Sequence, residues 1–349
     1  MSRFARPALE LGAPVLLLVA VAAIATSLKQ TTQLEFENAL VMVAIVVALY
    51  VFVGNSGVIS FGHVSFVAAG AYLSGLASIE PQTKAFTTPG LFGPLRHAHV
   101  GVVPSLALAA AVGAAYALVV GLLLMRLSGL PAGIATFAVL GITYNAIYYW
   151  NKIGPGAQTL TSVPSVGPWL LSVGAIICAV VAYAYQTSRF GRRLRASRED
   201  PAAARSVGVD IYRERVLAFT LSGALAGFAG GLHVHQFGVI TPGDYYLDLT
   251  FVTLAMLVFG GVGSLWGAVV GALAISALNS FLGDAENTVH VGFRLTLPNG
   301  TRLVTVGAVM ALVLILRPSG LTGGREFGLR FLAGRRPRGA SASTSTDLA

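Results

Sequence analysis

The sequence predicts an all-α integral membrane protein, a polytopic helix bundle of about 10 membrane segments with broken or re-entrant glycine-rich helices. Of its 349 residues, 55% are hydrophobic and only 11% are charged, whereas a soluble domain carries about 25% charged residues. The hydrophobic residues form long runs that alternate with short polar stretches. This pattern is typical of a chain that crosses a membrane many times.

Apolar runs mark the expected segments in chain order. The first, residues 12–28, imitates a signal peptide, but the many later runs favour an uncleaved first helix. Several later runs hold 15–18 residues, fewer than the ~20 that an upright helix needs, so re-entrant segments are expected. These runs are residues 39–53, 54–72, 101–125, 130–150 (interrupted by Pro131 and Gly133), 169–185, 216–236, 247–261, 265–282 and 303–316, with polar loops at 80–99 and 151–168.

Domain organisation follows from the same pattern. We expect residues 1–325 to form one transmembrane domain. Residues 326–349 are expected to be a disordered basic tail, because they are rich in Arg, Ser and Thr and lack apolar periodicity. The net charge of +9 indicates orientation and contact with anionic membrane lipid rather than nucleic acid. The single cysteine, Cys178, excludes an internal disulfide and a cysteine-based metal site.

Basic residues are distributed unevenly over the two sides of a ten-crossing chain. Both termini then lie on the same side as residues 187–215, and this side carries 17 of the 23 Lys and Arg residues. Because basic loops stay in the cytoplasm, both termini are expected to be cytoplasmic. An eight-crossing chain with two re-entrant hairpins gives the same sidedness, so both alternatives stay open. The six basic residues of the other side are Lys29, Lys84, Arg96, Lys152, Arg294 and Arg302.

Residues 187–215 are the most charged stretch and hold eight of the Lys and Arg residues. Each Arg costs about 2.5–3.5 kcal/mol at the bilayer centre, so this stretch lies in water. A short capped helix is expected within it, at residues 200–208. A loop that only fixes orientation is the alternative, but orientation does not require such a helix, which favours docking on a soluble partner. The residues of this expected docking helix are Asp200 (N-cap), Pro201 (first helical position), Ala203, Ala204 and Gly208 (C-terminal stop).

Glycine and serine residues interrupt the run at 54–72. They break or thin a helix at membrane depth, which is tolerated only where the backbone is buried in protein or lines a watery cavity. Broken helices also aim helix dipoles at a substrate, which suits a zwitterion. The predicted substrate path therefore includes Gly57, Ser60, Gly62, His63, Gly70 and Tyr72. Close packing of helices through small residues is the alternative.

His63 is the polar member of this path with the most specific chemistry. An intramembrane histidine is a functional candidate, and if it faces the solute, His63→Ala lowers uptake more than it lowers the amount of folded protein. The alternative is a hydrogen bond to a neighbouring helix. A metal site is not expected, because no second His or carboxylate stands at metal-ligand spacing. A second glycine-rich stretch, residues 260–271, suggests an internal repeat, and its Gly261 and Gly263 are assigned to the same path.

Several of these stretches, taken in order, resemble the LivM/LivH family of branched-chain amino acid permeases. The matching stretches are GVISFGHVSF at 57–66, SGLPAGIATF at 128–137, residues 188–204 with Gly208, and GGVGS at 260–264. The closing LRPSGL at 316–321 favours the LivM type. Ala203, Ala204 and Gly208 match the cytoplasmic loop of ABC importer permeases, with Ala202 in place of the usual acidic residue.

The resemblance implies a permease subunit of an ABC importer for leucine, isoleucine or valine in a prokaryotic cytoplasmic membrane. It also implies a second homologous permease subunit, two cytoplasmic ABC ATPase subunits and an extracytoplasmic solute-binding protein. Relatives in the same family carry urea or short amides, and more distant ones carry sugars. No phosphate-binding Gly-Lys-Ser/Thr loop occurs, so ATP is expected to be hydrolysed by the partner subunits, and no cofactor is expected.

Two other classes of protein fit less well. A secondary transporter needs intramembrane carboxylates for ion coupling, and Asp244 and Asp248 only flank a run. An intramembrane enzyme needs paired catalytic groups, and no Ser/His or Asp/Asp pair stands at a plausible spacing. The chain is therefore expected to be a transporter subunit and not an enzyme.

Overall fold

The computed structural model describes residues 5–286, 290–291, 293–294, 301–317, 319–324 and 326. The expected basic tail thus lies outside the described residues, apart from Glu326 at its start. The regular elements of the described part are helices, apart from a two-stranded antiparallel hairpin, β1 (His290–Val291) and β2 (Phe293–Arg294), and loops join them. The predicted all-α membrane fold is confirmed.

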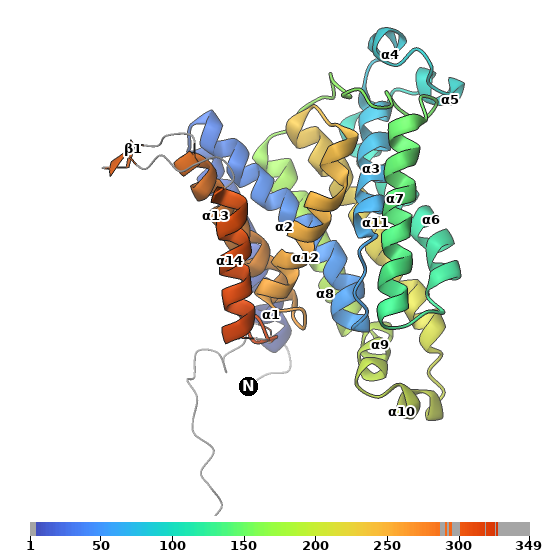
Figure 1. Cartoon of the computed structure of the whole chain (residues 1–349), viewed down its shortest axis with the longest axis vertical. Helices are drawn as coiled ribbons and strands as arrows, with labels where there is room; N and C mark the ends of the chain where they lie inside the picture. Colours follow the sequence, from blue (N-terminus) through green and yellow to red (C-terminus); the bar gives the residue numbers. More distant parts are fainter. Residues whose placement is uncertain are drawn as a thin grey trace, which may run out of the picture.

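In the described part of the chain, ten helices have 14 residues or more, and they run alternately between the two ends of the molecule (Figure 1). One end carries the short helices α9 (Arg189–Glu199) and α10 (Pro201–Ser206) and is called the α10 end; the other carries α4 (Pro81–Thr87) and α5 (Gly93–His97) and is called the α4 end. The ten long helices are α1 (Ala5–Thr26), α2 (Gln30–Ser56), α3 (His63–Ser78), α6 (Val102–Leu124), α7 (Leu130–Tyr149), α8 (Pro168–Thr187), α11 (Ile211–Phe237), α12 (Leu247–Gly260), α13 (Leu265–Glu286) and α14 (Thr301–Leu316).

Six of the described helices are long and apolar enough to cross a membrane, and the spans lie in α2, α6, α7, α8, α11 and α13. By contrast, α3 and α12 have 16 and 14 residues, in line with the short segments expected there. The described start of α1 and residues 319–324 both lie at the α10 end: the Tyr183 hydroxyl, near the end of α8, donates to Glu10 (3.4 Å), and Thr322 N–H donates to Gly260 O (3.1 Å).

Helix α2 forms the centre of the core. Its residues 39–56 are all buried, because the helix is apolar all round and other helices cover every face. Helix α11 packs against α2, α3 and α6, while α8 and α13 pack on other faces of α2.

The structure corrects three local expectations. Residues 80–99 hold α4 and α5 rather than an uninterrupted loop. Pro131 lies in the first turn of α7, where its missing N–H removes no helical hydrogen bond, and therefore does not interrupt that segment. Helix α9 was not predicted at all, although it is longer than α10.

Small residues let α11 approach its neighbours closely, as in small-xxx-small helix pairs. A Cβ built on Gly227 of α11 would meet the carbonyl oxygen of Ala109 and lie 3.0 Å from the Cα of Gly113, both in α6. Three residues later on α11, a Cβ on Gly230 would meet the carbonyl oxygen of Val67 in α3. The packing of α11 against α6 and α3 therefore depends on glycine at these contacts.

We expect Gly227→Val to lower the Tm of the detergent-extracted protein and the yield of monodisperse protein. The added atoms meet backbone, which cannot rotate away, so the cost is about 3 kcal/mol or more. Gly141→Val is the matched control, because a Cβ on Gly141 of α7 has no atom within 4 Å. An unchanged Tm in Gly227→Val would contradict this packing.

Candidate functional site

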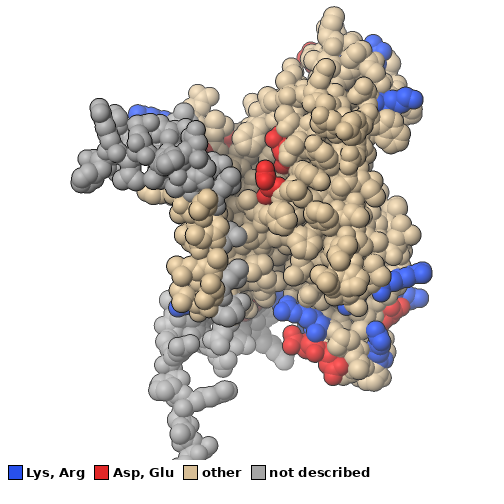
Figure 2. Space-filling view, in the orientation of Figure 1, with Lys and Arg blue, Asp and Glu red and all other residues tan. Residues whose placement is uncertain are grey.

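Charged side chains gather at the α10 end, around α9 and α10 (Figure 2). Ser188 is the N-cap of α9, and its Oγ accepts from the Gly191 N–H (3.2 Å). Its Leu194 is fully buried, whereas Arg192 is exposed. This amphipathic pattern explains why α9 lies on the end of the bundle rather than projecting into water.

Helix α10 has the caps that the sequence predicts. The Asp200 Oδ1 accepts from the N–H groups of Ala202 (2.9 Å) and Ala203 (3.0 Å), and Pro201 occupies the first turn. Gly208 ends the segment with φ +82°, a left-handed conformation that favours glycine. The predicted capped helix is confirmed, while its docking role remains a prediction.

Helix α10 and its C-cap expose a small apolar surface next to polar residues such as Arg205. Ala203 in the helix and Val207, the C-cap residue, are both exposed, Val207 to 79%, and the Val207 N–H donates to Ala203 O (3.3 Å). Ala204, in contrast, is buried against the rest of the chain. We call Ala203 and Val207 the docking face. Val207 was not predicted from the sequence as a docking residue. An apolar valine beside the glycine that ends a helix, within a charged loop, is itself a signal of such a residue.

Arg195 ties α9 to the core. Its Nε donates to Asn55 Oδ1 (2.7 Å), and its Nη2 donates to Gln186 Oε1 (3.0 Å) and to the hydroxyl of Tyr50. Tyr50 is fully buried in α2 and donates to the same Gln186 oxygen (2.5 Å). One turn later, Arg198 Nη1 donates to Gly54 O (3.0 Å). Helix α9, which α10 follows directly after Asp200, is thus hydrogen-bonded to the ends of α2 and α8.

A carboxylate close to this network caps α13. Glu326 accepts from the N–H groups of Leu265 (2.8 Å) and Trp266 (3.1 Å), where the positive end of the helix dipole lies. Burial raises the pKa of Glu326, and the two amides and Arg195 act in the opposite direction. Glu326 therefore joins the end of the described chain to the α10 end of the bundle.

Residues 57–62 separate α2 from α3, as the glycine-rich sequence predicts. Gly57 ends α2 with φ +70°, and Arg198 lies against it. At Gly62 a Cβ would lie 2.5 Å from the carbonyl oxygen of Thr136 in α7. The break is therefore filled by neighbouring protein at both positions.

His63 is buried at the start of α3. Its Nε2 lies 2.7 Å from Ser222 Oγ and its Nδ1 lies 2.8 Å from Ser60 Oγ. Because the Ser222 hydroxyl donates to Ala48 O (2.6 Å), Nε2 is assigned as the donor to Ser222 and Nδ1 as the acceptor from Ser60. Three aromatic rings surround the imidazole at centroid distances of 5.2–5.7 Å, those of Phe52, Phe66 and Phe219.

The other predicted path residues lie apart from His63. A Cβ on Gly70 would meet the Gly227 carbonyl oxygen, so Gly70 belongs to the α3–α11 contact. Tyr72 is buried, and its ring lies edge-on to the ring of Tyr245, with the two ring centroids 6.2 Å apart. Gly261 (φ +119°) and Gly263 pack against residues 319–324 at the α10 end. The structure does not bring the eight residues together around one cavity.

These contacts favour packing over solute binding for His63. We expect His63→Ala to lower folded protein and uptake in the same proportion, because both ring nitrogens already have partners. The measurement is uptake divided by the amount of folded protein in the membrane. Ser60→Ala, which leaves the Ser222 bond intact, is the milder matched variant. A selective loss of uptake in His63→Ala would instead support the predicted substrate path through residues 57–72.

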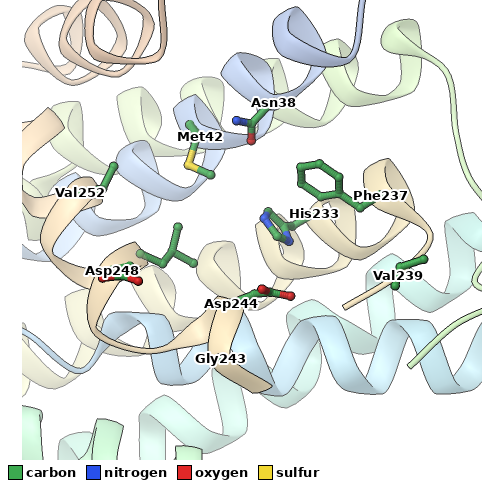
Figure 3. Close-up of a pocket in the computed structure, with 10 residues that line it drawn as sticks. Asn38, Met42, His233, Phe237, Val239, Gly243, Asp244, Asp248 and Val252 are labelled. Atoms are coloured by element: carbon green, nitrogen blue, oxygen red, sulfur yellow. The ribbon is translucent and has the colours of Figure 1, made fainter. Parts of the chain in front are cut away.

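A cavity of about 520 Å³ opens elsewhere, between α2, α11, α12 and the 3₁₀ helix η1 (Pro242–Tyr245) (Figure 3). The sequence placed Asp244 and Asp248 only at the edge of a span and missed the cavity. Among the described residues, no group of three or more His, Cys, Asp or Glu side chains is placed to hold a metal ion. The lining residues are Asn38, Met42, His233, Phe237, Val239, Gly243, Asp244, Asp248, Leu249 and Val252.

Comparison with known proteins identifies relatives over most of this bundle. The family model described as branched-chain amino acid transport system / permease component matches residues 36–316. This range includes α10, the break at residues 57–62 and every residue that lines the cavity.

The curated relatives that align over more than half of the chain include two permease proteins of different transport systems. The high-affinity branched-chain amino acid transport system permease protein LivM of Salmonella typhimurium is 26% identical over 310 residues, which covers 78% of this chain and 65% of the relative. The autoinducer 2 import system permease protein LsrC of an Enterobacter species is 33% identical over 223 residues, which covers 61% and 62%. The chain thus spans less than two thirds of the length of these relatives. No solved structure gives a significant match.

Proposed function

The chain belongs to the family of permease components of branched-chain amino acid transport systems, and from this premise we propose that it is the permease subunit of an ABC importer. In this proposal it moves leucine, isoleucine or valine across the prokaryotic cytoplasmic membrane. ATP is hydrolysed by separate ATPase subunits, and the chain itself is not an enzyme. The finer assignment to the LivM type is part of the proposal.

The observation that carries this proposal is α10 with its docking face. A rod about 10 Å long, at roughly 1.5 Å per residue, presents Ala203 and Val207 outward and is held by α9 on the bundle. Small apolar side chains on a rigid rod fit a groove on another protein. Closure of the ATPases then moves α9, and Arg195 passes this movement to α2 and α8.

The other subunits and the orientation are proposed on the same basis. They are a second homologous permease subunit, two ATPases on the α10 end and a solute-binding protein on the α4 end. The excess of basic residues around α10 favours a cytoplasmic α10 end, and hence cytoplasmic termini.

Autoinducer 2 is the second candidate solute, because the LsrC relative is 33% identical to the chain and the LivM relative, over a longer stretch, is 26% identical. Urea or a short amide, as implied by the sequence resemblance, is the third. Uptake of labelled leucine, urea and autoinducer 2 by cells that express the chain with its neighbouring genes separates these candidates. We expect saturable leucine uptake that stops when this chain is deleted. Uptake of autoinducer 2 or urea with no leucine uptake would refute the branched-chain assignment and leave the family assignment intact.

A further inference from the structure

The cavity between α2, α11, η1 and α12 lies within the depth of the helix bundle. Asn38 and Met42 stand 8 and 12 residues into α2, about 12 and 18 Å along the helix at roughly 1.5 Å per residue. His233 lies one turn before the end of α11. The cavity therefore sits in the half of the bundle nearer the α4 end.

Two carboxylates without a counter-ion line this cavity. Asp244 and Asp248 are both exposed, no Lys or Arg is among the ten lining residues, and neither carboxylate forms an ion pair among the described residues. A carboxylate facing lipid at mid-depth costs about 2.5–3.5 kcal/mol. Figure 2 shows acidic side chains in the upper middle of this face, apart from the charged side chains of the α10 end. The cavity therefore faces water or another protein, not lipid.

Polar atoms without partners point to a ligand. The His233 side chain is only 6% exposed; its Nδ1 lies 2.8 Å from the Tyr245 hydroxyl, and its Nε2 has no hydrogen-bond partner in the described part of the chain. Asn38 Oδ1 is itself a buried atom without a partner among the described residues. Figure 3 shows both side chains directed into the cavity from α11 and α2. Leaving the buried Asn38 Oδ1 unsatisfied costs about 1–3 kcal/mol, which a hydrogen-bonding ligand recovers.

The acceptors and the apolar wall define the chemistry of the ligand. One oxygen of Asp244 already accepts from the Thr241 N–H (2.6 Å) in the cap of η1. The remaining carboxylate oxygens and the Asn38 amide oxygen call for a cation with several N–H donors, and Met42, Leu249 and Val252 provide an aliphatic surface beside them. We propose that this cavity binds a primary ammonium group attached to a branched aliphatic chain, with the ammonium at Asp244 and Asp248. This assignment deepens the proposed function, on which its role in transport rests, and names the part of leucine that is recognised. Urea and autoinducer 2 lack such a group.

Charge-selective cysteine labelling tests the site without relying on transport. The reporter is Val252→Cys in the assembled complex in membrane vesicles, with the buried Cys178 replaced by Ala. We expect a cationic methanethiosulfonate to react at least about tenfold faster than an anionic one, because a cleft lined by one sign of charge concentrates counter-ions. Asp244→Asn with Asp248→Asn should abolish this preference, and Glu80→Gln, an exposed carboxylate at the α4 end outside the cavity, should keep it. Equal rates for both reagents, or no reaction with either, would overturn the proposal.

Protection of the same cysteine identifies the ligand class. Leucine and 3-methylbutylamine should slow labelling, whereas 4-methylpentanoate and urea should not. Protection by 4-methylpentanoate, or protection that survives Asp244→Asn with Asp248→Asn, would overturn the site. If 3-methylbutylamine protects but wild-type cells take up no leucine, the site stands and the proposed transport function fails.

Discussion

Replacing Ala203 with glutamate is expected to abolish uptake while leaving the protein folded in the membrane. Ala203 is exposed on the docking face, so a longer side chain can extend into water there. In the proposed groove of an ATPase, however, the carboxylate is buried without a partner. This costs about 3–5 kcal/mol at the contact, which corresponds to more than a hundredfold loss of affinity.

The measurement combines uptake, co-purification of the ATPases after mild detergent extraction, and solute-stimulated ATP hydrolysis. We expect all three to be lost in Ala203→Glu, and also in Gly208→Arg. Ala157→Glu makes the same chemical change at an exposed position in the loop between α7 and α8 and should behave as wild type. Normal uptake by Ala203→Glu, with the ATPases still bound, would exclude α10 as the docking element.

Arg195→Ala is expected to uncouple ATP hydrolysis from transport. Arg195 lies on α9 and leaves the docking face untouched, so the ATPases should still bind and hydrolyse ATP. The variant loses hydrogen bonds from a charged group to Asn55 and Gln186, each worth about 1.5–3 kcal/mol. Without them α9 moves without α2, and we expect at least about a tenfold fall in solute moved per ATP, an effect of about 1.4 kcal/mol or more.

Arg192→Ala is the matched control for this variant. Arg192 stands on the same helix but is exposed, and its Nε bonds only to Ser188 O within its own turn (3.4 Å). The ratio of solute moved to ATP hydrolysed is measured for both variants in the same membranes. A ratio in Arg195→Ala equal to that in Arg192→Ala would show that the network is structural and carries no coupling.

Local chemistry explains what the sequence could predict. The caps of α10 are encoded within nine consecutive residues, since Asp200, Pro201 and Gly208 act on their own helix. The break after α2 is likewise local, because Gly57 adopts a left-handed conformation at the helix end. The number and order of apolar runs follow from hydropathy alone.

Contacts between distant residues explain what was missed. In the sequence, Arg195 cannot be told apart from the other basic residues of its charged loop. In the structure, α9 brings Arg195 to Asn55, which lies 140 residues earlier in the chain. The sequence around Gly70 is compatible both with a substrate path and with close helix packing. The close approach of Gly227 in the structure favours packing. Asp244 and Asp248 gain their cavity from α2 and α11, which no local pattern reveals.

Accumulation of labelled leucine by the purified assembly in sealed vesicles tests the central claim, that this chain is driven by ATPases docked at its α10 end. Vesicles are prepared with ATP on the α10 side or on the α4 side, and with ion gradients collapsed by ionophores. We predict that leucine moves from the α4 side to the α10 side only when ATP is present on the α10 side, and that Ala203→Glu abolishes this movement. Accumulation that needs an ion gradient and no ATP, with Asp244 and Asp248 as its coupling carboxylates, would contradict the account and indicate a secondary transporter.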